Sequence, residues 1–563
     1  HLYGSQNPLH FAAIRMQASR LTRLADPLVA VVKSAGTKQR AKKYADDPHH
    51  RNAYRAVGCK LTAPIVFLQR IIVGTLGEPI GTFATLPDEI DAIARAAWGK
   101  IYKGVVSNVD QLVDRFITKH GQYLFHREEF VLGDLDPHEF MKHCTHTNMS
   151  AGGLDGWGTD DLSILSFEAY EWLTAMLNSI EKGADWPTAL HHSRSAFLAK
   201  DPDDAADPLG YRLLLIMPLV YRRWASIRLH HLQPWVEEWQ TEHMFAGVPK
   251  VGAEDAWWIT GLQFEHAQTK HISLTGASAD ILKCFDMIVR PLLYVILLTM
   301  GMPKRIVNAY MRYMENMVVY NTVLGGLGVG YKRPCGIPQG CPLSMMFVAA
   351  ILRPWIMAVK NTHTTPRVLA DDLMVFCTGT SHCSEAVKAI DFTHEYLHDI
   401  GAVVAPKKSY LFSTEPRARK WLANHIWPHL KVTIPVLLHG RDLGGQFNTT
   451  SRNVSATAND RLRNAISMLH RLQYLPLSIK EKAMIIRTKI IPAGLYGIQT
   501  ALPSQSLMRS MQAAIAEALG NHSARRCNAL IFELHSHGSD LDPDIISFVQ
   551  RIVTFRRMWA KHP

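Results

Sequence analysis

The sequence predicts an α+β fold, in which short antiparallel strands pack on helices and a helical region follows. Three observations predict it. Apolar runs at residues 368–370 and 373–376 flank an acidic dipeptide, a pattern typical of a β-hairpin. The longer apolar stretches 291–302 and 343–359 indicate buried helices. Beyond residue 445, three successive stretches have helical periodicity.

Three aspartates are expected at neighbouring strand ends. Asp371 and Asp372 form the tip of the predicted hairpin, and Asp280 follows a weak strand predicted for residues 275–279. Packed together without a cation, three carboxylates would repel one another, and at least one would tend to hold a proton. Mg²⁺ prefers oxygen ligands. The cluster therefore predicts a divalent cation site, although an isolated Asp-Asp pair is more often a solvated turn.

An unusual loop lies between these acidic segments. Residues 336–344 read Gly-Ile-Pro-Gln-Gly-Cys-Pro-Leu-Ser and precede the apolar stretch 343–359. This composition predicts a loop that enters a helix, with Pro342 in the first helical turn. Glycine at such a place lets the backbone approach a ligand closely.

These segments, in this order, resemble the reverse transcriptases of non-LTR (LINE-type) retrotransposons. The resemblance rests on Ala279-Asp280-Ile281-Leu282-Lys283-Cys284-Phe285-Asp286, on the loop 336–344 and on Val368-Leu369-Ala370-Asp371-Asp372-Leu373-Met374-Val375-Phe376, and it covers about residues 150–520. It implies a right-hand polymerase of fingers, palm and thumb, which copies RNA into DNA for retrotransposition. Leu369 stands where the family commonly has an aromatic residue, and Leu213 stands where it usually has proline.

The resemblance also implies roles for single residues. Asp280, Asp371 and Asp372 would hold two Mg²⁺ ions, for which Mn²⁺ is a possible substitute. Lys408, with Lys407 as the competing choice, would protonate the leaving pyrophosphate. The other implied roles are contact with the incoming triphosphate for Lys200 and Arg212, a steric gate against the ribose 2′-hydroxyl for Phe285, template contact for Gln339 and Gly340, and the primer grip for Leu443 and Gly444.

Five regions are expected along the chain. They are an N-terminal extension with a basic arm (1–148), fingers (149–270), palm (271–445), a helical thumb (446–520) and a C-terminal tail (521–563); fingers and palm together form the reverse transcriptase domain 149–445. The arm covers residues 33–55. A helix capped by Thr85 is expected to bury Ile90, Ile93, Ala97 and Ile101 and to dock onto the fingers.

Two further predictions concern helices of the fingers and of the thumb. The stretch 218–235 is expected to be a fingers helix that exposes Arg222, Arg223 and Arg228 to template phosphates. In the thumb, a capping box of Ser478 and Glu481 is expected to begin a helix that stops at Pro492, and the last helix is expected to end at Gly520.

Composition agrees with a nucleic-acid enzyme. The 563 residues carry a net charge of +12, which suits a polyanionic partner. No secretory signal or membrane span is visible, and the eight cysteines follow no disulfide or metal-binding spacing, so an intracellular location is expected, in nucleus or cytoplasm within a ribonucleoprotein. Because the chain begins with His1, we expect an excised segment of a polyprotein with a possible endonuclease domain upstream.

Three functions remain open from the sequence. The first is an RNA-directed DNA polymerase that uses an RNA template, a DNA primer or target and dNTPs. The second is an RNA-templated RNA polymerase, against which the aromatic Phe285 argues. The third is a catalytically inactive scaffold derived from such an enzyme, against which the retention of all three aspartates argues.

Overall fold

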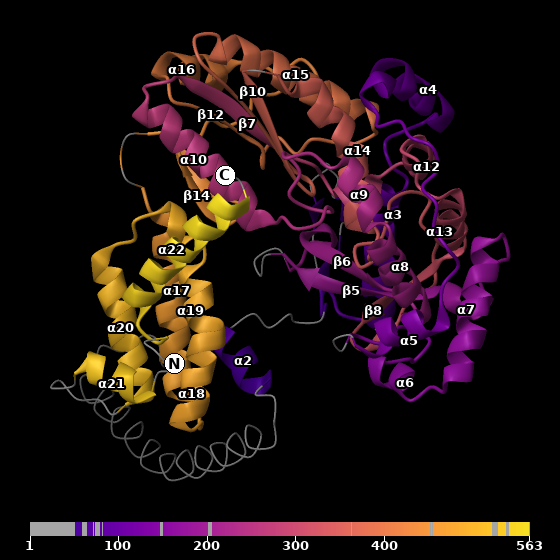
Figure 1. Ribbon diagram of the computed structural model, residues 1–563, viewed down its shortest axis with the longest axis horizontal. Coiled ribbons are helices and arrows are strands. Elements are labelled where there is room, and N and C mark those ends of the chain that lie inside the picture. Colours follow the sequence, from indigo (N-terminus) through magenta and orange to yellow (C-terminus); the bar gives the residue numbers. More distant parts are fainter. Residues whose placement is uncertain are drawn as a thin grey trace, which may run out of the picture. The chain divides into compact units, whose positions relative to one another are not determined.

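The computed structural model describes residues 51–58, 65–70, 72–73, 79–80, 83–146, 150–200, 205–361, 363–450, 452, 454–520, 527–535 and 540–561 (Figure 1). The predicted basic arm lies outside these ranges except for residues 51–55. The chain divides into two compact units, one of residues 62–454 and one of residues 1–61 with 455–563. Helices and strands alternate irregularly in the first unit and the second is helical in its described part, as expected for an α+β fold.

Two four-stranded sheets form the frame of the unit 62–454. The first has the order β10 (Thr364–Leu369), β11 (Asp372–Thr378), β7 (Leu274–Asp280), β12 (Tyr410–Ser413), and each pair is antiparallel. The second has the order β6 (Tyr211–Ile216), β5 (His192–Ala199), β8 (Val318–Val323), β9 (Gly326–Leu327), with β5 and β8 parallel. Three two-stranded sheets are β13 (His439–Asp442) with β14 (Gly445–Asn448), β1 (Leu68–Gln69) with β4 (Phe83–Ala84), and β2 (Ile72–Val73) with β3 (Pro79–Ile80).

Helices cover both faces of the first sheet. Helices α14 (Ser344–Val359) and α15 (His382–Asp399) contact one face, and α10 (Ala253–Thr269) with β14 contacts the other. The remaining helices of this unit are α3 (Pro87–Tyr102), α4 (Val109–His120), α5 (Pro137–Thr145), α6 (Thr159–Ser163), α7 (Phe167–Glu181), α8 (Leu219–His231), α9 (Gln233–Trp239), α11 (Cys284–Met287), α12 (Arg290–Thr299), α13 (Lys304–Asn316) and α16 (Pro416–Asn424). The two predicted buried helices are therefore confirmed as α12 and α14, but α14 begins two residues after Pro342.

The surroundings of the central strand β7 account for its unusual composition. It reads Leu-Thr-Gly-Ala-Ser-Ala-Asp, and all residues before Asp280 are buried because neighbours cover both faces. A Cβ on Gly276 would lie 2.4 Å from the carbonyl oxygen of Val375 and 2.7 Å from the Phe412 ring. The strand predicted as weak is thus confirmed, and its small residues are those for which the sheet has room.

Helix α3 packs against the second sheet, and its buried face differs from the predicted one. It begins at Pro87 with Leu86, not Thr85, at the N-cap, and its buried stripe is Ile90, Ala94, Trp98 and Tyr102. These residues share a core with Phe197, Tyr211 and Leu213 of the second sheet. The large aromatic residues decide the buried face, because they remove the most apolar surface from water.

The prediction for Arg222, Arg223 and Arg228 is wrong. Arg223 and Arg228 of α8 are buried, and Arg228 makes a two-fold ion pair with Glu181, with both N–O distances 2.7 Å. Arg222 donates to the carbonyl of Ala151 at 2.7 Å. These guanidinium groups bind the protein itself because α8 is covered on more sides than its local pattern indicates.

The second unit is a helical assembly in its described part. Its helices are α2 (Arg51–Gly58), α17 (Ala456–Gln473), α18 (Ile479–Ile485), α19 (Ile491–Leu495), α20 (Gln505–Leu519), α21 (Asn528–His535) and α22 (Pro543–Lys561). The capping box of Ser478 and Glu481 and the helix end at Gly520 are confirmed. Pro492 does not stop its helix, because a π-helical turn over Ile486–Ile490 joins α18 to α19 and accommodates it.

Residues far apart in the sequence complete this unit. Ala53 and Val57 of α2 are fully buried in the same core as Leu462 and Leu469 of α17. Lys489 donates to the carbonyl of Tyr54 at 2.8 Å. The N-terminal extension is therefore divided, with α2 in the helical unit and residues 62–146 in the other.

Candidate active site

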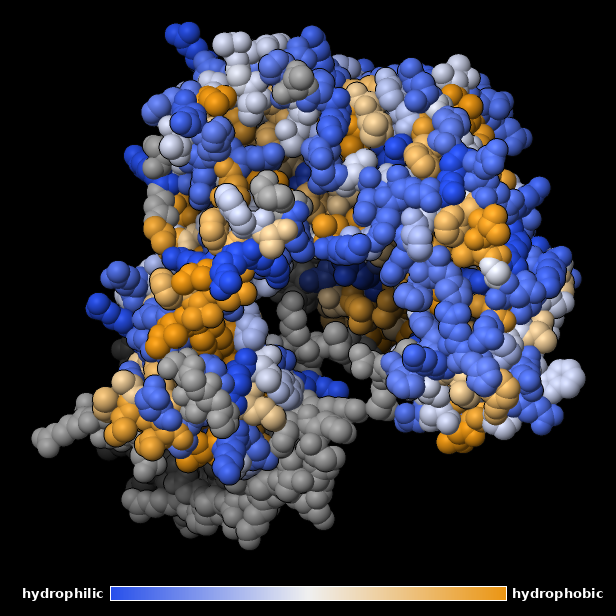
Figure 2. All heavy atoms as spheres, viewed as in Figure 1, coloured by the Kyte–Doolittle hydropathy of each residue, from blue (hydrophilic) through white to orange (hydrophobic). Residues whose placement is uncertain are grey.

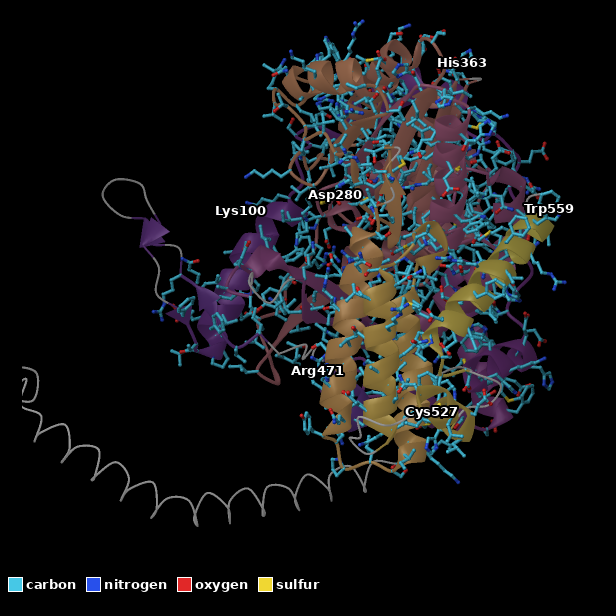
Figure 3. All side chains as sticks on the ribbon, turned by 90° about the vertical axis from the view of Figure 1, so that its left-hand side faces the viewer. Lys100, Asp280, His363, Arg471, Cys527 and Trp559 are labelled. Atoms are coloured by element: carbon cyan, nitrogen blue, oxygen red, sulfur yellow. The ribbon has the colours of Figure 1, made fainter. Side chains whose placement is uncertain are left out.

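The three sequence-predicted aspartates lie at one end of two central strands. Asp280, labelled in Figure 3, ends β7. It is paired in register with Asp372, the first residue of β11. Asp371 belongs to the tight turn that joins β10 to β11. Its neighbour Ala370 has a φ of 54°, which is costly for a residue with a Cβ. The antiparallel register of β7 and β11 is what brings the carboxyl groups of Asp280 and Asp372 together.

The pKa values of all three carboxyl groups are raised. Burial is the main cause for each, and it raises the pKa of Asp372 to about 7. Negative charge on Asp371 raises the pKa of Asp280 further, and the charges of both raise that of Asp372. Positive charge on Lys408 lowers the pKa of Asp280, and Arg367 lowers that of Asp372. The cluster therefore favours a bound cation, which would relieve its repulsion.

The oxygen donors fit Mg²⁺ in type. Within the described ranges, no three His, Cys, Asp or Glu side chains are arranged to hold a metal ion between them. Mg²⁺ usually takes only one or two protein carboxylates, with waters and substrate phosphates completing its shell. Asp280, Asp371 and Asp372 supply carboxylates of that kind, and Mn²⁺ accepts the same donors.

Three of the basic residues named from the sequence lie close enough to the aspartates to act on their charge. Lys200 follows β5, and Arg212 lies in β6 opposite Leu198. Arg212, Lys200 and Lys408 all lower the pKa of Asp371 by their charge. Burial lowers the pKa of Lys200, and repulsion from Lys408 and Arg212 lowers it further. Crowded cations of this kind gain stability when an anion such as a triphosphate lies between them.

A short turn holds Lys408 in place. The amide of Ala405 donates to the carbonyl of Asp280 at 2.8 Å, and the Ser409 hydroxyl accepts from the Asp280 amide at 3.1 Å. The turn closes with a 3.0 Å bond from the Lys408 amide to Ala405. Lys408, and not Lys407, is among the charges that act on the aspartates.

The loop 336–344 is bonded to strand β6 and to helix α11. The backbone oxygen of Gln339 accepts from the amide of Leu215 in β6 at 2.8 Å, and Ile337 donates to the carbonyl of Phe285 at 2.7 Å. Gly340 has a φ of 126°, and a Cβ there would lie 2.3 Å from the Leu215 oxygen. Gly340 is exposed and Gln339 is half-buried, whereas residues 336–338 are buried.

Two of the predicted side chains already have protein partners. The Gln339 amide donates to Asp286 at 3.2 Å, and Asp286 also pairs with buried Arg333 at 2.8 Å. Phe285 in α11 is half-buried and packs on the main core. Template contact by Gln339 would therefore use an amide oriented by Asp286.

The predicted primer-grip residues form a hairpin turn. Leu443 and Gly444 join β13 to β14, with φ values of 47° and 94°, as in the type I′ turns that suit two-residue hairpins. The residue before this turn is connected to the aspartates through an arginine. Buried Asp442 pairs with buried Arg367 at 2.8 Å, and Arg367 lies 3.6 Å from Oδ1 of Asp372.

Sequence reasoning missed Lys283 and Arg367. The Lys283 ammonium donates to the carbonyls of Leu209 at 2.7 Å and Tyr211 at 3.0 Å and lies 4.1 Å from the Trp98 ring centre. Burial, together with repulsion from Lys200, lowers the pKa of Lys283 to about 7. Lys283 stands between Asp280 and Asp286 in the sequence, and Arg367 precedes the apolar residues 368–370, so no local pattern marks either of them as a site residue.

The sheet carries clustered carboxylates beside basic side chains. This arrangement is the one that enzymes acting on phosphate esters require, and it defines the class of protein. Comparison with known families gives the particular assignment. Residues 200–426 match the family described as reverse transcriptase (RNA-dependent DNA polymerase). A reverse transcriptase domain is therefore present, and the enzyme is an RNA-directed DNA polymerase, a nucleotidyltransferase. The match includes every predicted site residue except Leu443 and Gly444.

Part of the chain lies outside this match. Residues 1–199 and 427–563 hold β5, the hairpin β13–β14 and the helical unit. None of the helices in the described ranges has the length and apolar character required for a membrane span.

Proposed function

We propose that this chain extends a primer 3′-hydroxyl with dNTPs on an RNA template by two-metal nucleotidyl transfer, as part of retrotransposon copying of the LINE type. One observation carries the proposal: the register that places Asp280 beside Asp372, with Lys200, Arg212 and Lys408 facing them. In-line displacement at phosphorus needs both a carboxylate-held cation pair and positive charge for the developing pyrophosphate.

The aspartates would hold the two ions, which supply charge stabilisation for the attacking and leaving oxygens. Lys200 and Arg212 would bind the triphosphate from the fingers side. Lys408 would lie near the leaving pyrophosphate, to which an ammonium can donate a proton. The turn of residues 405–409 fixes this lysine relative to Asp280, since both flanks of the turn bond to the Asp280 backbone.

The remaining roles follow from position. Phe285 packs against the core and so offers a rigid ring for excluding a ribose 2′-hydroxyl. The exposed backbone of Gly340 offers close approach to a base pair. The turn Leu443-Gly444 would support the primer end. In this assignment the sheet of β7 and β10–β12 is the palm, the sheet of β5 and β6 belongs to the fingers, and the helices α17–α20 form the thumb.

The partners proposed are an RNA template, a DNA primer or target site and dNTPs, within an intracellular ribonucleoprotein of the nucleus or cytoplasm. The net charge of +12 supports nucleic-acid partners. An endonuclease domain elsewhere in a parent polyprotein belongs to the same proposal. The string Leu495-Tyr496-Gly497, similar to one in LINE-type chains, supports the subclass.

The first test is primer extension on a poly(rA)/oligo(dT) duplex with Mg²⁺ and dTTP. We expect extension by the parent chain and none by Asp371→Ala, with duplex binding unchanged in both. Asp114→Ala is the matched control, because Asp114 is an exposed aspartate on α4. Absence of extension by a parent that still binds duplex would contradict the proposal, and UTP preferred over dTTP would point to an RNA polymerase.

A second test separates the two lysines. Lys408→Ala should lower the extension rate by about 10²-fold, the usual range for a positioned proton donor, whereas Lys407→Ala should leave it nearly unchanged. Single-turnover kinetics with saturating dTTP measure the chemical step. Equal effects of the two substitutions would remove Lys408 from the assigned role.

A further inference from the structure

Helix α22 has an apolar face that is exposed in the part of the helical unit that the structure describes. The buried residues of the helix are Pro543, Ser547, Thr554 and Met558. Arg551 adds a bond of 2.8 Å to the carbonyl of Ala501. The opposite face is apolar and open to solvent, as the hydrophobic atoms over α22 in Figure 2 show.

The open face follows the spacing of a helix–helix seam. Its members are Ile545, Phe548, Ile552, Phe555 and Trp559, which alternate at steps of three and four residues and are 45, 65, 44, 55 and 65% exposed. Apolar residues at this 3.5-residue period pack against another helix with the same pattern. Phe555 and Trp559 contact each other, with ring centres 6.0 Å apart. Trp559, labelled in Figure 3, lies near the end of the helix.

The area of this face matches an interface. Val549 and Val553 flank the seam with 49 and 55% exposure. Residues of these types have full surfaces of roughly 150–250 Å², so the seven together expose about 700–800 Å². The largest apolar patch of an ordinary monomer is about 300–600 Å², whereas each partner in a standard interface contributes about 800 Å².

We propose that α22 pairs with α22 of a second copy of this chain, with the two helices antiparallel. Charge selects the direction, because the helix carries Asp544 in its first turn and Arg556, Arg557 and Lys561 near its end. Antiparallel pairing places the acidic end of each helix beside the basic end of the other, whereas parallel pairing places like charges together. A two-fold axis through the contact between the two Ile552 side chains relates the copies, so every other contact of the seam occurs twice.

Pairing in this register places Ile545 of one copy opposite Trp559 of the other. The interface is isologous, so two copies close it completely and no open chain of subunits forms. This inference is independent of the polymerase assignment, because no residue of the seam belongs to the unit that carries the aspartates.

The first measurement is the mass of the full chain by sedimentation velocity over a concentration series. We expect the parent to be a dimer, and Phe548→Glu with Phe555→Glu to be a monomer with unchanged circular dichroism, because both residues are exposed. Trp172→Glu is the matched control: Trp172 is 71% exposed on α7, and its substitution should leave the dimer intact. A monomeric parent at all concentrations, or a dimeric double variant, would overturn the proposal.

The second measurement tests direction by cross-linking in a Cys527→Ser background, since Cys527 is exposed. Ile545→Cys and Trp559→Cys chains are prepared separately and mixed, and a short bis-maleimide is added. Antiparallel pairing predicts a cross-link between positions 545 and 559 in the mixture and none in either sample alone. Cross-links within each separate sample would show parallel pairing and refute the arrangement proposed.

Discussion

Substitution of Asp442 by asparagine tests how the turn of residues 443–444 is connected to the aspartates. Asp442 and Arg367 are a buried ion pair, with side chains 4 and 2% exposed. Tyr410 donates to the same carboxylate at 3.3 Å, and Arg367 also contacts the Thr260 hydroxyl at 3.3 Å. Asp442→Asn keeps the shape of the side chain and removes its charge.

The expected loss of unfolding free energy is large because the Arg367 charge stays buried without its partner. Removing one member of a buried ion pair typically costs about 3–5 kcal/mol of unfolding free energy, since the other charge is left uncompensated. Asparagine keeps one acceptor, so the lower end, about 3 kcal/mol, is expected. The Arg367 guanidinium, already 3.6 Å from Asp372, would then pair with that carboxylate and compete with a cation for it.

Two assays follow this substitution. Urea unfolding of the full chain should show the loss of about 3 kcal/mol in Asp442→Asn, and little loss in the double variant Arg367→Met/Asp442→Leu, because apolar replacement of a buried pair is often neutral. Binding of Mn²⁺ measured by electron paramagnetic resonance should weaken several-fold in Asp442→Asn. Glu385→Gln, which breaks the exposed pair with Lys388, is the control and should cost less than about 1 kcal/mol.

An Asp442→Asn chain that is as stable as the parent and binds Mn²⁺ equally well would refute this connection between the turn and the aspartates. If stability falls while Mn²⁺ binding is unchanged, the pair is structural and Arg367 does not reach Asp372. Primer extension by the same proteins reports independently on catalysis, so a failure of the polymerase proposal would not be mistaken for a failure of this one.

Three other predictions concern the same unit. Phe285→Ala should raise incorporation of UTP relative to dTTP at least about 10-fold, since about 1.4 kcal/mol of steric discrimination is enough for that change; an unchanged ratio would remove the gate. Burial raises the pKa of Asp399, but hydrogen bonds from His120 and Lys119 outweigh burial and lower this pKa to about 2. That carboxylate therefore stabilises the fold above its unfolded pKa near ~4, and about 2 kcal/mol is lost as pH falls from about 4 to 2; Asp399→Asn should flatten unfolding free energies in that range, and an unaltered slope would contradict the assignment. Gly340→Val, at a φ of 126° and against a backbone oxygen, should abolish extension while circular dichroism stays unchanged, and full activity would show that the loop adapts.

Local patterns in the sequence determined the parts of the site that depend on neighbouring residues. The hairpin around Asp371 and Asp372, the helices α12 and α14 and the capping box at Ser478 all follow from periodicity or cap chemistry within a few residues. The reason is physical: strand alternation, turn conformation and helix capping are short-range effects. The order of the two acidic segments and the loop between them was enough to indicate the reverse transcriptase domain that the family match confirms.

Only the tertiary structure decided which charges pair. Arg228 pairs with Glu181, and Arg367 pairs with Asp442. Helix α2 shares a hydrophobic core with helices from the other end of the chain. An arginine within an apolar stripe gives the same local pattern whether its partner is a phosphate in solvent or a carboxylate brought from far along the chain. Burial of that partner is a property of the packed fold, so the side-chain identities alone could not distinguish a binding surface from an internal ion pair.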